Sequence, residues 1–185
     1  MPTVPKTSPE QITKAARKLI ARVGAENLSM QGLAAAVGVR APSLYKHFPD
    51  RASILGAVTR EVALELEKTL AEAASTGAPR KDLAAIAHAY RHYAHRFPRL
   101  YGLMFTAEAG LTKGESRRFG HALFVVLNQW IPSSKHLLEA ARALVAFTHG
   151  FVMMEQSGAF QLGGDVERAF DFGLERLIEA LAAPG

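Results

Sequence analysis

The sequence contains no cysteine among its 185 residues. This excludes a disulfide framework, a thiol nucleophile and a thiolate metal site. The sequence also has no unbroken apolar run that approaches the roughly 18 to 20 residues needed to cross a bilayer, and residues 1–11 lack the hydrophobic segment of a signal peptide. We therefore expect a cytoplasmic protein.

Strict alternation of apolar and polar residues, the pattern of a half-buried strand, is also missing. Every long segment instead has apolar residues at helical spacing, and the hydrophobic share of 49% is enough for a substantial core. The sequence therefore predicts an all-α fold. Beyond residue 79 we expect helices at about 80–96, 99–105, 115–130, 134–157 and 165–182, with a loop at 110–114.

Acidic residues are scarce in the first third of the chain. Residues 1–60 hold nine Lys or Arg and three Asp or Glu, a formal charge of +6, whereas residues 61–185 carry −1. A basic head on a neutral body is typical of a protein that meets a polyanion at one end. The alternative is a basic face that is merely solvated.

The first helix has a clear start and a clear end. Ser8 is placed to cap its N-terminus, Pro9 suits the first helical position, and Gln11 stands where a capping box needs Glu or Gln. Gly24 follows the last apolar residue and is expected to end the helix. These signals predict a helix over residues 9–23.

Two short helices joined by a glycine turn are predicted next. They span Ser29–Ala36 and Ala41–His47, with Gly38 between them, and Asp50 caps a long fourth helix that runs to about residue 75. This is the pattern of a helix-turn-helix, which places its second helix in the major groove of DNA. We therefore assign residues 1–55 to a three-helix DNA-binding domain, and residues 56–185 to a second helical domain joined to it through the fourth helix.

The outward side chains of the second short helix predict contacts with DNA. Its N-terminal residues enter the groove, so we expect base contacts from Arg40, Ala41, Pro42 and Ser43. Phosphate contacts are expected from Tyr45, Lys46, His47 and Arg51, and a further base or phosphate contact from Gln31. For each of these polar side chains, the alternative is plain solvation or packing.

The same residues carry a family resemblance. The segment Leu28–Ala34, then Val37–Val39, Ser43–Phe48 and Asp50-Arg51 resemble the DNA-binding signature of the TetR family, over residues 8–57 without gaps. The family more often has Lys where Arg51 stands. The resemblance implies a C-terminal domain for ligand binding and dimerisation, in an obligate homodimer that is usually a repressor and leaves its operator when a small molecule binds.

Further expectations for the C-terminal domain follow from this resemblance. Phe147-Thr148-His149-Gly150 resembles a TetR subgroup with a Trp/His-Gly motif, although the usual Trp is missing. We expect dimerisation through the apolar faces of the last two helices, which carry Ala143, Leu144, Phe147, Phe151, Met154, Phe170, Leu174, Leu177 and Leu181. Because family ligands lie among the middle helices, we expect an uncharged apolar or aromatic effector bound by Tyr90, Met104, Phe105, Phe124, Leu127, Trp130, Phe147 and His149. The alternative for each of these is an ordinary core position.

Three histidines suggest a different function. His88, His92 and His95 share one helical face, a geometry that can hold zinc. That face lies opposite the apolar stripe of the same helix, which is formed by Leu83, Ala87, Tyr90, Ala94 and Phe97. In addition, no acidic residue or cysteine nearby in the sequence completes a set of metal ligands. No cofactor is therefore predicted. A helical metalloenzyme or hydrolase is disfavoured because the sequence lacks HExxH, GxSxG and paired Glu-x-x-His segments. An architectural DNA-coating protein would not need so large a neutral body.

Overall fold

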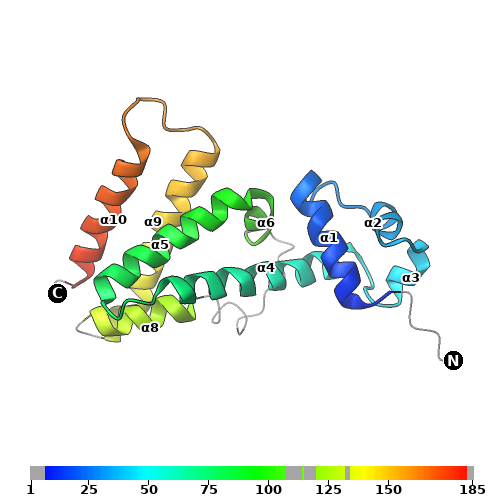
Figure 1. Cartoon of the computed structure of the whole chain (residues 1–185), viewed down its shortest axis with the longest axis horizontal. Coiled ribbons are helices and arrows are strands. Elements are labelled where there is room, and N and C mark those ends of the chain that lie inside the picture. Colours follow the sequence, from blue (N-terminus) through cyan, green and yellow to red (C-terminus); the bar gives the residue numbers. More distant parts are fainter. Residues whose placement is uncertain (1–6, 107–113, 115–119, 132–133, 183–185) are drawn as a thin grey trace. The chain divides into compact units, whose positions relative to one another are not determined.

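A computed structural model describes residues 7–106, 114, 120–131 and 134–182. These residues form helices and no strand, which confirms the all-α prediction (Figure 1). The helices are α1 (Pro9–Val23), α2 (Met30–Val37), α3 (Ala41–Tyr45), α4 (Arg51–Ala73), α5 (Pro79–Arg96), α6 (Pro98–Leu103), α8 (His121–Trp130), α9 (Leu137–Gln156) and α10 (Val166–Ala182), with a 3₁₀ turn η2 (Ser134–His136) before α9.

The cap of α1 is the one that the sequence predicts. The backbone N–H of Gln11 donates to Ser8 Oγ at 3.3 Å, and the N–H of Ser8 donates to Gln11 Oε1 at 3.1 Å. Gly24 ends the helix with a φ of 88° and donates its N–H to the Ile20 carbonyl. Both ends of α1 are therefore determined by residues within four positions of them.

The chain divides into two compact units, and the first is built from Met1–Leu64 together with Phe97–Glu115. Its core is formed by the fully buried side chains Ile12, Ile20, Leu33, Leu44, Ile54, Leu55 and Tyr101. α6 contacts α1 in this unit, where Arg99 donates a hydrogen bond to the Arg22 carbonyl. We predict a DNA-binding domain that is one continuous segment, residues 1–55. The first unit instead combines two segments that are separate in the sequence.

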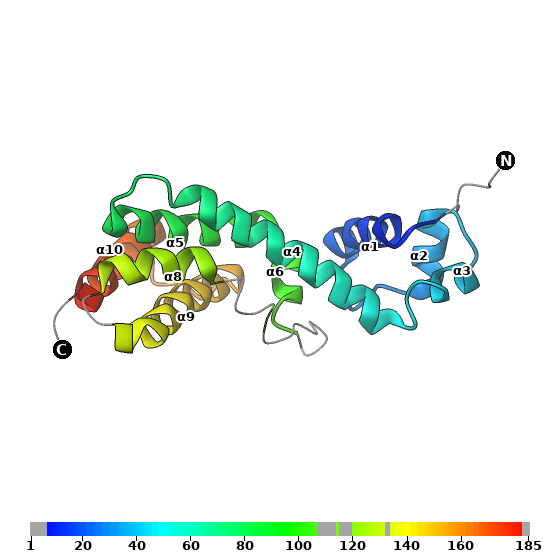
Figure 2. The same ribbon diagram turned by 90° about the horizontal axis from the view of Figure 1, so that it is seen from below.

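The second unit comprises Glu65–Arg96 and Ser116–Gly185. Within it, α5 contacts α8, α9 and α10, and α9 contacts α8 and α10, as Figure 2 shows from a second direction. Leu83, Leu127, Phe170 and Leu174 are almost fully buried in this bundle. Trp130 Nε1 donates to the Ile178 carbonyl at 2.9 Å, which ties α8 to α10.

α9 is long and apolar enough to cross a membrane by length and composition. It is not an unbroken apolar run, because Glu139, Arg142 and Glu155 interrupt it. α9 nevertheless packs on three other helices of its unit. Its burial of Ala140, Leu144 and Val152 is the ordinary behaviour of a helix in a protein core.

Most predicted helix ends lie within a few residues of the observed ones. α3 ends at Tyr45 instead of His47, and α6 ends at Leu103 instead of residue 105. The expected loop at 110–114 lies outside the described residues apart from Gly114, and so does the first part of the helix expected at 115–130.

Candidate DNA-binding interface

The turn between α2 and α3 is fixed by local hydrogen bonds. Ser29 Oγ accepts the N–H of Gly32 at 3.0 Å and so caps α2. At the other end Gly38 adopts a left-handed conformation, with φ 79° and ψ 32°, and its N–H donates to the Ala35 carbonyl. A residue with a Cβ would be strained at this φ, so glycine sets the angle at which the chain enters α3.

One buried anchor determines which face of α3 is turned outward. Leu44 is fully buried, and the N–H groups of His47 and Phe48 both donate to the Leu44 carbonyl. Val37 and Val39, on either side of Gly38, are half-buried. Because Leu44 points inward, the remaining side chains of this short helix lie at or near the surface.

The predicted DNA-contacting residues occupy this outer surface. The exposed ones are Gln31, Arg40, Pro42, Tyr45, Lys46 and His47, while Ala41 and Ser43 are half-buried. Tyr45 leaves 52% of its surface exposed, which does not fit a packing role for the whole ring. The surface combines amide, guanidinium, hydroxyl, ammonium and imidazole groups, the types that recognise base edges and phosphates.

Arg51 has a structural task that the sequence did not reveal. Its Nε donates to the Leu28 carbonyl at 3.0 Å and its Nη2 to the Ala25 carbonyl at 2.6 Å. The half-buried guanidinium therefore fastens the α1–α2 connection to the start of α4. A phosphate contact by Arg51 stays a prediction. The guanidinium would have to make it while it also donates hydrogen bonds to the Leu28 and Ala25 carbonyls.

Glu10 places a carboxylate near the end of this surface. A hydrogen bond to Ser8 is the main reason that the pKa of Glu10 lies below its usual value, with smaller contributions from the backbone and from the charge of His47. The start of α1 therefore lies close enough to His47 to interact electrostatically. The phosphate contact predicted for His47 would have to form beside this negative charge.

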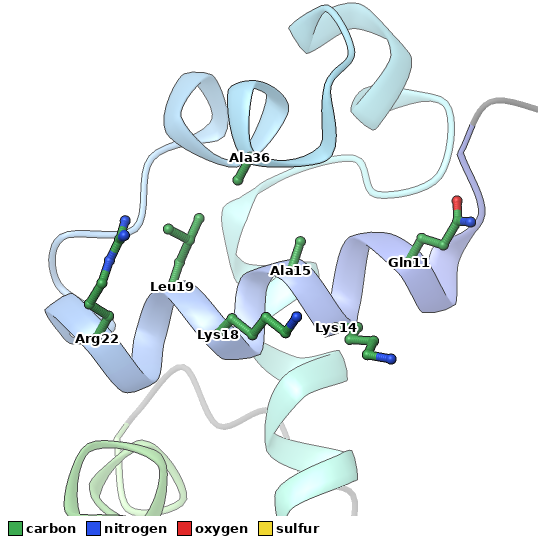
Figure 3. Close-up of a pocket in the computed structure, with 7 residues that line it drawn as sticks. All are labelled: Gln11, Lys14, Ala15, Lys18, Leu19, Arg22 and Ala36. Carbon is green, nitrogen blue, oxygen red and sulfur yellow. The ribbon is translucent and has the colours of Figure 1, made fainter.

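A basic groove on α1 was not predicted from the sequence. It lies between α1 and α2, has a volume of about 440 Å³, and is lined by Gln11, Lys14, Ala15, Lys18, Leu19, Arg22 and Ala36 (Figure 3). The three basic residues are four positions apart and therefore share one face of the helix. The net charge of residues 1–60 shows that this segment is basic, but it does not show that Lys14, Lys18 and Arg22 line one groove.

The predicted effector-binding residues fall in both units. Met104 is half-buried and Phe105 is 51% exposed in the first unit, where the Phe105 ring packs against Tyr101 with centroids 5.1 Å apart. The other six lie in the second unit, on helices that contact one another: Tyr90 on α5, Phe124, Leu127 and Trp130 on α8, and Phe147 and His149 on α9.

Several of these six side chains are engaged in packing. Leu127 is fully buried, Trp130 bonds to α10, and the ring of Phe147 stacks on Phe170 with centroids 5.6 Å apart. Burial lowers the pKa of His149, which favours its neutral form. A different groove of about 510 Å³, lined by Met154, residues 159–166 and Ala169, contains none of the predicted residues.

The outer faces of α9 and α10 are apolar. Leu138, Val145, Met153 and Met154 of α9 are 41 to 47% exposed, and Phe172 of α10 is 69% exposed. Of the residues that we expected at a dimer interface, Leu144, Phe170 and Leu174 are buried within this unit. Leu177 and Leu181 are half-buried, and Phe151 packs on Phe170. Only Met154 of that set is exposed. The sequence therefore predicted apolar helices here without identifying their outer faces.

The histidine face of α5 is not isolated, which corrects the expectation that no acidic residue lies nearby. Arg91 binds Glu155 of α9 through Nε and Nη2, at 2.9 and 2.6 Å, and Glu167 of α10 through Nη1 at 2.5 Å. His95 Nε2 lies 2.8 Å from Glu155, and His88 Nε2 lies 3.1 Å from Asp171. Folding brings together charges that are 60 or more residues apart in the sequence.

Arg91 and Glu155 are the most buried members of this cluster. Their side chains are 12% and 11% exposed. The bidentate bond to Glu155 raises the pKa of Arg91 further above its usual value. Burial alone would raise the pKa of Glu155, but the hydrogen bonds from Arg91 and His95 hold it below its usual value. Both residues are therefore charged at neutral pH and connect α5 to α9.

Two family descriptions match separate parts of this chain. Residues 12–58 match the bacterial regulatory proteins of the tetR family, and residues 83–177 match the tetracyclin repressor-like C-terminal domain. The first match covers α2 and α3 together with most of α1 and the start of α4. The second covers more than half of the chain and extends from α5 into α10.

Individual proteins agree with both matches. An uncharacterized HTH-type transcriptional regulator of Mycobacterium tuberculosis, Rv0681, is 28% identical over 83% of this chain and 72% of its own length. YobS of Bacillus subtilis, also an HTH-type transcriptional regulator, is 26% identical over 93% of this chain and 91% of its own.

A solved structure shows the same fold. BioQ in complex with its double-stranded DNA operator superposes with a TM-score of 0.73 at 24% identity, over 96% of this chain and 99% of that one. The described residues have the corresponding helices, and the helix-turn-helix presents the polar surface described above. The chain belongs to the TetR family of DNA-binding transcriptional regulators.

Proposed function

We propose that this regulator is a repressor that binds an inverted-repeat operator as a homodimer and is released by a small apolar effector. The observation that carries the proposal is the outer surface of α3, where Arg40, Tyr45, Lys46 and His47 are exposed around the buried anchor Leu44. Charge supports it, because the basic excess of the chain lies within residues 1–60.

The residues of this surface divide between sequence readout and positioning. Arg40 immediately precedes α3, at the end that enters the major groove, where a guanidinium can pair with the two acceptors of a guanine. Lys46 follows the last residue of α3 and is suited to a phosphate, which fixes register without reading sequence. Lys14, Lys18 and Arg22 offer further phosphate contacts along α1.

A homodimer is supported by the exposed apolar faces of α9 and α10. Two copies related by a two-fold axis can cover these faces by forming a four-helix interface. A two-fold dimer presents two copies of α3, so its operator is an inverted repeat. BioQ, which has the same fold, has been solved with its double-stranded DNA operator.

The effector is proposed to act through α4. This helix is continuous from Arg51 to Ala73, and the division between the two units falls within it at Leu64. A ligand that shifts the C-terminal part of α4 changes the spacing of the two recognition helices in a dimer. The coupling free energy of such a pair of sites is of order 1 to 3 kcal/mol, and each ligand weakens the other equally.

The chemistry of the effector is inferred from the side chains predicted to line its site. Tyr90, Phe124, Trp130 and Phe147 are aromatic, and His149 is held towards its neutral form by burial. An uncharged aromatic or apolar molecule fits such a lining. We also infer membership of the subgroup with a Trp/His-Gly motif from Phe147–Gly150, and action in the cytoplasm, where the operator lies.

The test begins with selection of binding sites from random DNA, followed by in vitro transcription from a promoter that contains the selected site. We expect an inverted repeat with half-site centres about 34 Å or a multiple apart, preferred over random DNA by roughly 10³-fold or more, and transcription that decreases when protein is added. Enrichment of a single half-site, or transcription that increases, would contradict the proposal.

Release by an effector needs its own measurement. A panel of uncharged aromatic compounds is screened for release of the selected operator, and an active compound is then tested against Phe147→Trp. We expect the enlarged side chain to weaken both binding and release while dimerisation and operator binding are retained. Release that depends only on charged compounds would exclude the predicted chemistry.

A further inference from the structure

We propose that His88 of α5 and Glu167 and Asp171 of α10 form a binding site for a divalent transition-metal ion. One ring nitrogen and two carboxylate oxygens of these residues all lie within 4.8 Å of one another. Glu167 and Asp171 are four positions apart on α10 and therefore adjacent on its surface. All three residues belong to the second unit, in which α5 contacts α10.

The distance between His88 Nε2 and Asp171 Oδ1 fits coordination of both atoms to one metal ion. His88 Nε2 lies 3.1 Å from Asp171 Oδ1. Two ligand atoms that are each about 2.1 Å from a metal, at octahedral or tetrahedral angles, are about 3.0 to 3.4 Å apart. Glu167 Oε1 lies 4.0 Å from the other ring nitrogen, His88 Nδ1, so its side chain has to turn to reach an ion that is bound at Nε2. Since 58% of the Glu167 side chain is exposed, it can turn towards the ion.

Asp171 carries the strongest indication that a cation belongs here. Its Oδ1 is a buried atom and, among the described residues, has no hydrogen-bond donor, although the imidazole of His88 is close to it. In the tautomer of neutral His88 that carries its proton on Nδ1, the ring Nε2 and the Asp171 Oδ1 that faces it are both acceptors. A metal ion between them removes this conflict, because both atoms can then donate a lone pair.

The charges of the surrounding cluster agree with this. Glu155, Glu167 and Asp171 contribute three negative charges, and Arg91 contributes one positive charge, which gives −2 before the two histidines are counted. Arg91 forms its bidentate bond with Glu155, so that carboxylate largely compensates its charge. A divalent ion at His88 and Asp171 balances the remainder.

The neighbouring groups hold these ligands in place. The ring of Phe170 lies edge-on to His88, with centroids 5.3 Å apart, and orients the imidazole. Arg91 Nη1 binds Glu167 Oε2 at 2.5 Å, which leaves Oε1 to face the site. Such outer contacts orient metal ligands and tune their affinity. His88 and Asp171 are 42% and 47% exposed, so water can reach the ion and complete its coordination.

The mixed ligand set selects a class of metal. Imidazole favours zinc, cobalt, nickel and related ions, whereas magnesium and calcium prefer oxygen ligands alone. We therefore use Zn²⁺ and Co²⁺ as probes and Mg²⁺ as the negative comparison. The site does not depend on the proposed repressor function, and its test uses no DNA.

The experiment is calorimetric titration of the full chain with Zn²⁺, together with the visible absorption of Co²⁺. We expect one ion per chain, and binding at least about tenfold weaker in both His88→Ala and Asp171→Asn. Asp171→Asn keeps the size of the side chain, so it is informative even if His88→Ala folds poorly. His92→Ala is the matched control, because His92 is exposed on the same helix, and its affinity should equal that of the wild type.

The opposite outcomes are clear. Absence of Zn²⁺ binding by the wild type overturns the site, and so does a His88→Ala variant that binds Zn²⁺ as tightly as the wild type. Weakening by His92→Ala to the same extent as by His88→Ala would place the metal elsewhere on α5. Equal binding of Mg²⁺ would show nonspecific attraction to carboxylates.

Discussion

The outer surface of α3 and the outer surfaces of α9 and α10 have opposite chemistry. Around α3 the exposed side chains are Arg40, Tyr45, Lys46 and His47, which donate hydrogen bonds and carry positive charge. On α9 and α10 large apolar side chains are exposed, with Phe172 as the most exposed of those on the two helices. A polar basic surface suits a polyanion, and an apolar surface suits another protein surface.

The difference shows how a small chain separates two tasks. In the proposed function, DNA is recognised by polar groups held around one buried anchor, Leu44, whereas dimerisation requires complementary apolar area. The two regions should therefore respond to different changes. Substitutions on α9 and α10 should change the oligomeric state, and so the number of DNA-binding domains that act together. Substitutions near α3 should change the affinity and specificity of each DNA-binding domain.

The largest effect is expected from Phe172→Glu. A charge on the exposed apolar face of α10 should prevent dimerisation and so remove the gain that two linked heads provide, about 10² to 10⁴ in operator affinity. Light scattering gives the mass and a binding titration gives the affinity. Leu64→Glu, at a 56% exposed position on α4, is the control and should remain a dimer. If Phe172→Glu stays dimeric and binds fully, the interface lies elsewhere.

A smaller effect is expected when Arg51 is changed to Lys. Lys keeps the charge but cannot donate to both the Ala25 and Leu28 carbonyls in the geometry of the guanidinium. Loss of these hydrogen bonds should reduce the free energy of unfolding by about 1 to 3 kcal/mol, as measured by urea titration.

Arg51→Met separates the structural task from a phosphate contact. It lacks both the hydrogen bonds and the charge, so it should be destabilised like Arg51→Lys. Additional loss of operator affinity in Arg51→Met alone would show that the charge of Arg51 also meets phosphate. If Arg51→Lys is as stable as the wild type, the two carbonyl bonds do not hold the α1–α2 connection.

The smallest effect is expected on the stability of the variant Glu67→Gln. Glu67 is a half-buried residue of α4 in the second unit. Burial raises its pKa above 4.5, partly offset by the Ala122 N–H, which donates to Oε1 at 2.9 Å, and by the charge of His121. Because the folded state then holds this proton more tightly than the unfolded state, the protein loses stability as the pH rises from about 4.5 through the raised pKa of Glu67. Glu67→Gln keeps an acceptor for Ala122 without a charge to desolvate.

The melting temperature of Glu67→Gln should therefore match the wild type near pH 4 and exceed it slightly at pH 7. Glu72→Gln, at an exposed position of the same helix, should show no such rise with pH. A Glu67→Gln variant that is less stable than the wild type at pH 7 would mean that the charge itself is needed.

Local features made the first unit predictable. The side chains of Ser8, Ser29 and Asp50 each accept a hydrogen bond from a backbone N–H three residues later. Gly38 adopts the left-handed conformation that the turn after α2 requires. The inward position of Leu44 follows from helical spacing. These physical causes are short in range, so a single sequence contains them.

Contacts between distant residues explain what was missed. Arg51 reaches carbonyls 23 and 26 positions earlier, and His88 meets Asp171 from another helix. Helical spacing placed His88 on a polar face, but it could not show that α10 brings carboxylates to that face. It also could not show that α6 joins the first unit through Arg99. Tertiary packing decides these pairings.

The central claim is that α3 reads DNA sequence through Arg40 and fixes its position through Lys46. Its most direct test is the affinity of the wild type, Arg40→Ala and Lys46→Ala for every single-base variant of the selected operator, measured at several salt concentrations. We expect Arg40→Ala to lose about 1 to 3 kcal/mol of discrimination at one base pair of each half-site, and Lys46→Ala to bind all variants more weakly with a salt dependence reduced by about one ion per head. A uniform loss of affinity in both variants would contradict this division of roles.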